Sequence, residues 1–479
     1  MGIISGKQFI NRIDDLHNEV WIHGKKVDGK ISNHTAFKGM LHSKAKLFDM
    51  QTDPRHQPLL TFALPGTSEK ANFSFKQPAT KADLTDRRLA TQLWAKTNAG
   101  LLGRSPDYIN SAIMSLAAAA PLLGKNNKKF GKNIRQIYER AAAEDLTFTH
   151  TFINPQTNRS ISFFESDDMI IAAKVVDENS DGIVVKGARL LATQGGLTDE
   201  LLVLPAGGNF IDESYIYGFI IPSNTPGLKF MCRESFVSGD SEFDYPFSTK
   251  YEEIDSVVVF DDVLVPWERV FLYKDLNIAF EMTQEVDMFT LLSFQSVTRQ
   301  VVKTEFILGL TQLIIDAINI SEFQHVKDKA SEIIVGLEIM KSLLLTSENQ
   351  CQHNTFGMMT PEKNALNAAI IYYPKLYPRL VEVIHLLGAS GLITLPTEKD
   401  FLSDNTRPYI DQYLQGAGSD SLERVKIFRL AWDLTMSSFG SRQTLYERFF
   451  FGDPVKLAMS LYNGYDKTPY VEMVKELLD

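Results

Sequence analysis

The spacing of apolar residues divides this chain of 479 residues into three parts. From residue 3 to about 145, apolar side chains recur every three or four positions, for example over 80–102 and 108–120, which predicts amphipathic helices. From Ser160 to about Tyr273 the period changes to two, and Gly, Pro, Asp and Asn separate the short apolar runs, which predicts β-strands. The helical period then returns, and long helices are expected over Thr298–Ile320, His325–Gln350, Ala365–Leu387 and Ser421–Phe450.

This order of elements predicts an α+β protein with three domains. Residues 1–147 are expected to form an N-terminal helical domain and residues 148–273 a central antiparallel β-barrel, because the strands follow one another without intervening helices. Residues 274–479 are expected to form a C-terminal four-helix bundle with a tail, because successive long helices favour an up-and-down arrangement.

Composition and charge narrow the function. Hydrophobic residues make up 44% and charged residues 23% of the chain, as in globular proteins, and the net charge of -10 argues against binding to a phosphate backbone. Two cysteines, Cys232 and Cys351, cannot form a disulfide framework or a four-ligand metal site, so no metal is expected. Without a signal peptide or a long apolar run, a cytoplasmic protein is expected.

Common nucleotide and hydrolase motifs are absent from the sequence. No Gly-x-Gly-x-x-Gly follows a predicted strand, and neither a Walker A sequence nor a Gly-x-Ser-x-Gly elbow occurs. The sequence therefore offers no visible site for a Rossmann-type dinucleotide or for a nucleoside triphosphate.

A polar stretch from Leu146 to Arg159 lies where the helical pattern gives way to strands. It holds His150, amides, hydroxyls and an arginine around a turn at Pro155. These groups can together bind a polar heterocycle and move a proton. They are equally consistent with a domain junction whose polar side chains cap a helix and complete a turn.

Three further segments carry candidate chemistry. Arg104 and Tyr108 project from the start of a helix that Pro106 opens, although an exposed arginine usually forms only a surface ion pair. Glycines in 387–396 could let the backbone approach a flat or anionic ligand, or could simply end a helix. Arg442 could bind a phosphate, whereas the aromatic residues that follow it are typical of a core.

Together these segments resemble the two-component flavin-dependent monooxygenases, and more narrowly the oxygenase components of the 4-hydroxyphenylacetate 3-monooxygenase family, which have an acyl-CoA dehydrogenase-like fold. The residues that carry the resemblance are Gly103–Tyr108, Thr149–Gln156, Val263–Pro266, Gly388–Pro396 and Tyr446–Phe449.

The resemblance implies that reduced FAD and oxygen hydroxylate a phenol, 4-hydroxyphenylacetate in the first place, through a flavin C4a-hydroperoxide. Oxygen is transferred to the carbon ortho to the phenol hydroxyl. By resemblance, Arg104, Tyr108 and His150 are the catalytic residues and bind that hydroxyl. His150 acts as base or hydrogen-bond acceptor, Arg104 as electrostatic stabiliser and Tyr108 as positioning donor.

The resemblance also implies a flavin site and a pocket for the substrate tail. The flavin-binding residues are expected to be Gln156, Thr157, Asn158, Arg159, Thr193, Gly388, Ser390, Gly391, Gly440, Ser441, Arg442 and Gln443. The tail is expected at Pro205 and Ala206, where relatives that hold an arylacetate carboxylate place small hydroxyl residues. Because Pro205-Ala206-Gly-Gly has no hydroxyl, another phenol is an open alternative to 4-hydroxyphenylacetate.

The resemblance further implies a separate flavin reductase and a homotetramer. An acyl-CoA dehydrogenase-type flavin oxidoreductase is the first alternative, and a scaffold or flavin carrier without catalysis is another. The 4-hydroxybutyryl-CoA dehydratase branch needs three cysteines and a histidine around an iron–sulfur cluster, which two cysteines cannot supply.

Overall fold

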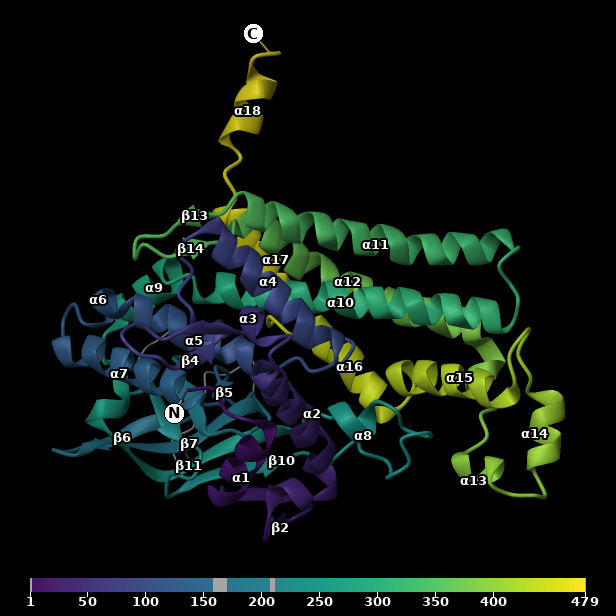
Figure 1. Cartoon of the computed structure of the whole chain (residues 1–479). Coiled ribbons are helices and arrows are strands. Elements are labelled where there is room, and N and C mark those ends of the chain that lie inside the picture. The colour runs from purple at the N-terminus through teal and green to yellow at the C-terminus, as the bar shows by residue number, and fades with distance from the viewer. Residues whose placement is uncertain (1, 158–169, 207–211, 479) are drawn as a thin grey trace. The chain divides into compact units, whose positions relative to one another are not determined.

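The computed structural model describes residues 2–157, 170–206 and 212–478 and shows an α+β protein (Figure 1). The chain divides into two compact units. Unit 1 comprises Met1–Lys303 and Gln352–Thr360, and unit 2 comprises Thr304–Cys351 and Pro361–Asp479. The predicted domain boundaries at 147 and 273 stay a prediction.

The N-terminal part of unit 1 is helical, as the apolar spacing predicts. Its longer helices are α1 (Gly6–Asp15), α2 (Thr35–Thr52), α4 (Lys81–Lys96), α5 (Pro106–Ala118) and α7 (Lys128–Glu144). Ser5 and Thr80 close capping boxes at the starts of α1 and α4. The expected helix over 80–102 ends at Lys96, because Ala99 and Gly100 adopt the left-handed backbone conformation, with φ of 53° and 68°.

The strands of unit 1 form two main sheets. The larger sheet has the order β2 (Lys25–Lys26), β1 (Val20–Ile22), β10 (Leu228–Cys232), β11 (Asp255–Pro266), β7 (Gly182–Thr193), β6 (Lys174–Glu178). The smaller sheet has the order β12 (Val270–Tyr273), β9 (Tyr217–Pro222), β8 (Glu200–Val203), β5 (Phe148–Thr151).

The prediction of an antiparallel barrel is therefore wrong in two respects for the described residues. The strands form open sheets rather than one closed barrel, and the pairs β1–β10 and β5–β8 are parallel. Alternation along a strand indicates which side chains are buried, but not which strand lies beside it or in which direction. The strand expected at 161–164 lies outside the described residues.

The two main sheets pack around a shared apolar core. Val203 and Phe219 of the smaller sheet and Val185 and Val258 of the larger sheet are fully buried in it. Strand β5 is joined to β7 by a bridge between Ile153 and Leu190. Two threonines strengthen the join: the Thr151 hydroxyl donates to the Leu190 carbonyl at 2.7 Å, and the Thr149 hydroxyl donates to the Thr193 carbonyl at 2.7 Å. Because side chains alternate along a strand, the residue between these threonines faces the other side of the sheet.

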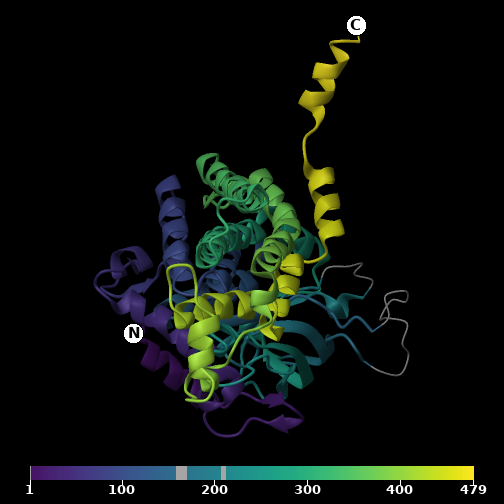
Figure 2. The same cartoon turned by 90° about the vertical axis from the view of Figure 1, so that its right-hand side faces the viewer.

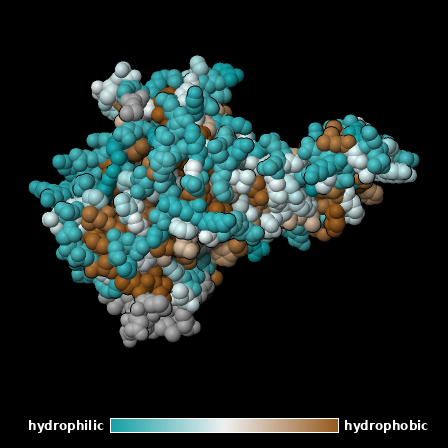
Figure 3. Space-filling model, turned by 90° about the horizontal axis from the view of Figure 1, so that it is seen from below, coloured by the Kyte–Doolittle hydropathy of each residue, from teal (hydrophilic) through white to brown (hydrophobic). Residues whose placement is uncertain are grey.

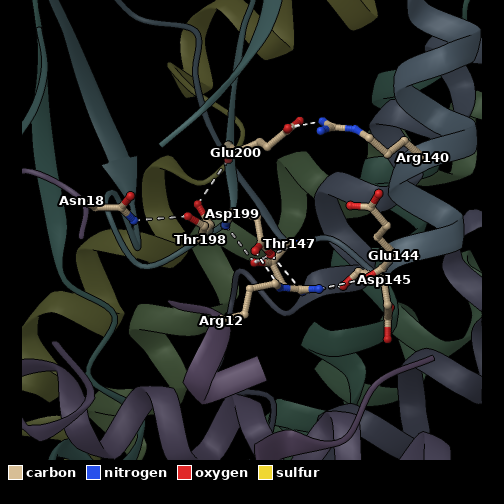
Figure 4. Close-up of polar contacts among 9 residues, drawn as sticks. All are labelled: Arg12, Asn18, Arg140, Glu144, Asp145, Thr147, Thr198, Asp199 and Glu200. Atoms are coloured by element: carbon tan, nitrogen blue, oxygen red, sulfur yellow. Dashed lines mark hydrogen bonds and ion pairs between the residues drawn. The ribbon is translucent and has the colours of Figure 1, made fainter. Parts of the chain in front are cut away.

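A buried polar network fixes the start of β5 (Figure 4). The Asp199 carboxylate accepts hydrogen bonds from the Thr147 backbone N–H and hydroxyl, both at 2.7 Å, and pairs with Arg12 of α1 at 2.7 Å. Arg12 also donates to the carbonyls of Glu144 and Asp145, which end α7. The network thus ties the first helix, the end of α7 and the strand start together.

Unit 2 consists of helices. It holds the C-terminal part of α10 (Met288–Ala317), followed by α11 (Gln324–Asn349), α12 (Lys363–Gly388), α15 (Ser421–Thr435) and α16 (Ser438–Phe449). The fourth long helix expected over Ser421–Phe450 is thus two helices. They are separated because Ser437 takes an extended backbone conformation and its hydroxyl caps α16 by accepting the Gly440 N–H at 3.1 Å.

None of the residues of the last two helices, α17 (Pro454–Gly464) and α18 (Thr468–Lys475), is buried. Helix α18, at the yellow end of the ribbon, lies away from the other helices of its unit in both views (Figures 1 and 2). Among the described residues, no helix combines the length and the apolar character that crossing a membrane requires.

Candidate active site

Arg104 and Tyr108 lie at the start of α5, as expected. The Arg104 guanidinium carbon stacks 4.3 Å from the centroid of the Tyr108 ring. Between them, Asp107 fixes the first turn by accepting hydrogen bonds from the Ser105 hydroxyl at 2.5 Å and the Thr91 hydroxyl at 3.0 Å. The turn that presents the two side chains is therefore held from both α4 and α5.

His150 joins this pair from strand β5. It lies between Thr149 and Thr151, whose side chains bond to β7, so its ring faces the opposite side of the sheet. Its ring centroid lies 5.8 Å from that of Tyr108. The structure thus brings together a guanidinium, a phenol and an imidazole that the sequence places on separate elements.

Burial sets the charge state of these groups. Loss of solvent, aided by the Arg104 cation, holds the pKa of the His150 imidazole well below its usual value, so the ring is neutral at neutral pH. Its Nδ1 atom is buried and finds no hydrogen-bond partner among the described residues. Burial raises the pKa of the Tyr108 phenol, which stays protonated. The site therefore offers a neutral imidazole, a hydroxyl donor and a fixed cation to a bound molecule.

Residues that the sequence analysis did not single out complete the surroundings. The Phe152 ring lies 4.4 Å from the His150 ring and 6.4 Å from the ring of Phe289 on α10. Arg299, 1% exposed, is a second cation that favours ionisation of Tyr108. Phe152 lies within the segment Thr149–Gln156, but no sequence signal marked Phe289 or Arg299, since an aromatic or a single charge on a helix is typical of packing.

The predicted flavin residues of unit 1 lie on β7 and after β5. Thr193 is 3% exposed and its hydroxyl donates to Asp255 at 2.8 Å, whereas Gln156 and Thr157 are exposed. Asn158 and Arg159 lie outside the described residues.

The surface near these residues suits a flat, partly polar ring. Ile153 and Leu191 are 40% and 55% exposed. The space-filling view shows brown, hydrophobic surface on the face of the molecule that it draws (Figure 3). Beside Ile153, the buried Oδ1 atom of Asn154 has no hydrogen-bond partner in the part of the chain that the structure describes. Exposed apolar side chains next to a buried unpaired acceptor fit an isoalloxazine ring.

Pro205 and Ala206 follow β8, the parallel neighbour of β5. His150 pairs with Leu202 in this ladder, so Pro205 and Ala206 lie three and four residues beyond the strand position opposite His150. Ala206 is buried and Pro205 half-buried. Neither has a side-chain hydrogen-bonding group, and residues 207–211, which follow in the sequence, lie outside the described residues.

The remaining predicted flavin residues belong to unit 2. Gly388 ends α12, and Ser390 and Gly391 lie in the short 3-10 helix η6 (Ala389–Leu392), where Ser390 is exposed. A Cβ atom on Gly391 would lie 2.5 Å from the Phe428 ring, so this glycine is required for packing on α15. Close packing therefore explains this glycine without a ligand.

The segment Gly440–Gln443 lies within the first two turns of α16. A Cβ atom on Gly440 would lie 2.5 Å from the Leu434 carbonyl, which again points to packing. Ser441 is exposed, whereas Arg442 and Gln443 are 8% and 0% exposed, and the Arg442 guanidinium stacks 4.7 Å from the Tyr446 ring. Unit 2 thus presents a buried guanidinium at a helix start.

Comparison with known proteins identifies the family. Residues 5–272 match the family described as 4-hydroxyphenylacetate 3-hydroxylase N terminal, and residues 279–479 match the corresponding C-terminal family. The chain is 50% identical over 478 residues to a probable 4-hydroxyphenylacetate 3-monooxygenase of Bacillus subtilis, covering 100% of this chain and 99% of that protein.

Solved structures agree with this assignment. A crystal structure of the oxygenase component of 4-hydroxyphenylacetate 3-monooxygenase, complexed with FAD and 4-hydroxyphenylacetate, is 42% identical, covers 99% of this chain and 98% of that chain, and has a TM-score of 0.95. An archaeal 4-hydroxybutyryl-CoA dehydratase, 18% identical over 99% of this chain and 95% of that chain, shares the fold with a TM-score of 0.89. The two family matches and the identity along the whole chain show that the protein belongs to the 4-hydroxyphenylacetate 3-hydroxylase family.

Proposed function

We propose that this chain is the oxygenase component of a two-component flavin-dependent monooxygenase that hydroxylates a phenol ortho to its hydroxyl group. The observation that carries the proposal is the buried cluster of Arg104, Tyr108 and a neutral His150. The overall reaction converts a phenol, O2 and FADH2 into a catechol, water and FAD. Its first substrate candidate is 4-hydroxyphenylacetate, the compound bound in the related oxygenase structure.

The three residues divide the work of activating the phenol. A phenolate is a far better nucleophile toward an electrophilic oxygen than a phenol, so a base beside the hydroxyl accelerates the reaction. His150 is neutral and its Nδ1 is buried without a protein partner among the described residues, so it can accept a hydrogen bond from the phenol hydroxyl and draw the proton away from its oxygen. Arg104 stabilises the resulting negative charge, and the Tyr108 hydroxyl holds the phenol oxygen in place.

FAD is the cofactor that fits the surroundings of this cluster. Reduced flavin, when bound, would supply the two electrons that activate O2, of which one atom is transferred to the phenol and the other leaves as water. We assign Ile153 and Leu191 to the face of its ring, with Asn154, Gln156 and Thr193 as hydrogen-bonding residues. Excluding water from the site protects activated oxygen from wasteful decay, and the Phe152 ring adds apolar surface beside His150.

The phosphate-bearing part of the cofactor is assigned to charged and small residues further along the chain. Arg442 is the candidate partner of a phosphate, because a guanidinium binds phosphate oxygens in a bidentate manner. Asn158 and Arg159 are proposed on the family resemblance alone, and so are Thr157, Gly388, Ser390, Gly391, Gly440, Ser441 and Gln443.

A specific observation keeps a second substrate open. Pro205 and Ala206, the proposed neighbours of the substrate tail, have no side-chain donor for a carboxylate. A phenol with an uncharged tail would bind there without leaving a buried charge unpaired. A hydroxylase of such a phenol is therefore the alternative to one acting on 4-hydroxyphenylacetate.

The proposal also covers a partner reductase, the fold family and the oligomeric state. A separate reductase supplies FADH2, as the term oxygenase component in the relative's name suggests. The fold is proposed to be acyl-CoA dehydrogenase-like, with the helices of unit 2 as its bundle. A homotetramer is also proposed, and the exposed apolar side chains of α17 and α18, such as Tyr462 and Met473 at 68% and 60% exposure, support association with further copies.

The test mixes the protein anaerobically with FADH2, adds O2 and a panel of phenols, and measures catechol formed per O2 consumed. Charged and uncharged tails are included to separate the two substrate candidates. His150→Ala is expected to lower catechol formation at least about 100-fold, as for loss of a general base, while FADH2 binding stays within about threefold. His42→Ala, at an exposed histidine, is the matched control. A His150→Ala variant as active as the control would remove His150 from the reaction.

A further inference from the structure

A buried carboxylate holds the backbone that carries Arg104. Glu253 lies between α8 (Ser248–Tyr251) and β11 and is 0% exposed. Its Oε2 atom accepts the Gly103 backbone N–H and its Oε1 atom accepts the Arg104 backbone N–H, both at 2.8 Å. Two successive amides bound to the two oxygens of one carboxylate fix both the position and the direction of the loop.

A buried amide and a buried cation complete the arrangement. The Gln194 side-chain amide donates to Glu253 at 2.9 Å and to the Arg104 carbonyl at 3.0 Å. Lys44, 1% exposed, donates to the Gln194 side-chain oxygen at 2.9 Å. Burial lowers the pKa of Lys44 to about 8, so Lys44 remains mostly protonated at neutral pH. Its positive charge offsets the negative charge of Glu253, from which the Gln194 side-chain amide separates it.

We propose that Glu253 is a positioning residue for Arg104 and keeps its guanidinium over Tyr108 and beside His150. The inference rests on the proposed function, in which these three residues bind the phenol. The Glu253 carboxylate binds the backbone N–H of Arg104, so the proposed effect acts through that backbone. The effect can be large, because displacing a catalytic group by about 1 Å can cost about 100-fold in rate.

The neighbouring residue provides a matched control. Glu252 is 1% exposed, as buried as Glu253, but its carboxylate pairs with Arg233 at 2.7 Å. Glu253→Gln keeps the shape of the side chain but leaves it one acceptor oxygen. The new NH2 group then faces the backbone N–H of Gly103 or Arg104, and that hydrogen bond is lost. Glu252→Gln makes the same chemical change at the Arg233 pair.

The first measurement is amide hydrogen exchange of the peptide containing residues 101–106. Glu253→Gln is expected to speed exchange in this peptide by about 10- to 100-fold, the equivalent of about one or two lost hydrogen bonds, whereas Glu252→Gln leaves it unchanged. This readout needs no enzymatic activity.

The second measurement is a double-mutant cycle on the rate of phenol hydroxylation. Glu253→Gln is expected to lower kcat about 10- to 100-fold in the wild-type background but to change it less than about twofold in the Arg104→Ala background. Glu252→Gln should leave kcat within about twofold of the wild type. If Glu253→Gln does not fold, Gln194→Asn, which shortens the bridge to Lys44, is expected to show the same non-additivity.

Either of two results overturns the inference. One is equal amide hydrogen exchange of the 101–106 peptide in the Glu253→Gln and Glu252→Gln variants. The other is a Glu253→Gln effect on kcat that is as large in the Arg104→Ala background as in the wild type. A wild-type protein that forms no catechol from any phenol would instead overturn the proposed function. In that case the exchange measurement alone decides whether Glu253 holds the loop.

Discussion

Replacing Asp199 should destabilise unit 1 strongly, because its carboxylate satisfies buried groups that cannot reach water. Asp199 is 4% exposed and Thr147, whose N–H and hydroxyl it accepts, is 0% exposed. In Asp199→Ala each of these two buried groups loses its acceptor at a cost of about 1–3 kcal/mol. Arg12 adds less than about 1 kcal/mol, because its side chain is 24% exposed and can turn to solvent.

The sum is about 2–7 kcal/mol, which for a unit of this size corresponds to a fall in melting temperature of about 3–11 °C. The assay is thermal unfolding followed by circular dichroism, with Asp261→Ala as the control. Asp261 pairs with Lys229 at 2.7 Å on the surface, and its loss should cost less than about 1 kcal/mol. An Asp199→Ala variant that melts within about 2 °C of the control would show that the hydrogen bonds of Asp199 do not stabilise unit 1 as argued.

Three further predictions concern single residues. The folded state holds the His150 pKa below the value of about 6.5 in the unfolded chain, so the unfolded state binds more protons below that pH. The free energy of unfolding should therefore fall as the pH decreases from about 6.5. Denaturation curves from pH 7 to 5 should show a steeper fall for the wild type than for His150→Gln. Arg104→Lys should lower kcat/KM for hydroxylation at least about tenfold, because a compact ammonium cannot stack flat on Tyr108, and equal activity of the variant would contradict the stacking role. Gly440→Ala should destabilise by about 1–3 kcal/mol because its new methyl group would lie 2.5 Å from a backbone carbonyl. Gly309→Ala, in the middle of α10 where the methyl group meets no described atom within 4 Å, should instead stabilise by about 0.5–1 kcal/mol, and urea midpoints of the two variants that shift in the same direction would refute the comparison.

Features that depend on neighbours in the sequence could be predicted from it. Ser5 and Thr80 start helices through capping boxes, and Pro106 opens the helix of the candidate site. Strand segments such as Gly182–Thr193 follow from alternating apolar residues and bounding turns. The family resemblance, carried by short motifs, extended this local information to Arg104 and to the other expected site residues.

Pairings between distant segments could not be predicted, because spacing within a strand does not specify its partner. The parallel pairing of β5 with β8 places Leu202 opposite His150, and only the folded sheet reveals it. The break at Ser437 within the expected long helix depends on a side-chain cap that competes with helix continuation.

Residue types and their local spacing predicted the order of helical and strand segments and the α+β class, and the family resemblance added the candidate site residues. They did not predict the strand partners or every helix end. The bonds between Glu253 and the backbone of Gly103 and Arg104, which are about 150 residues away in the chain, are visible only in the folded protein. The physical reason is that a buried carboxylate must find its donors wherever the folded chain supplies them, and burial also makes the His150 ring neutral.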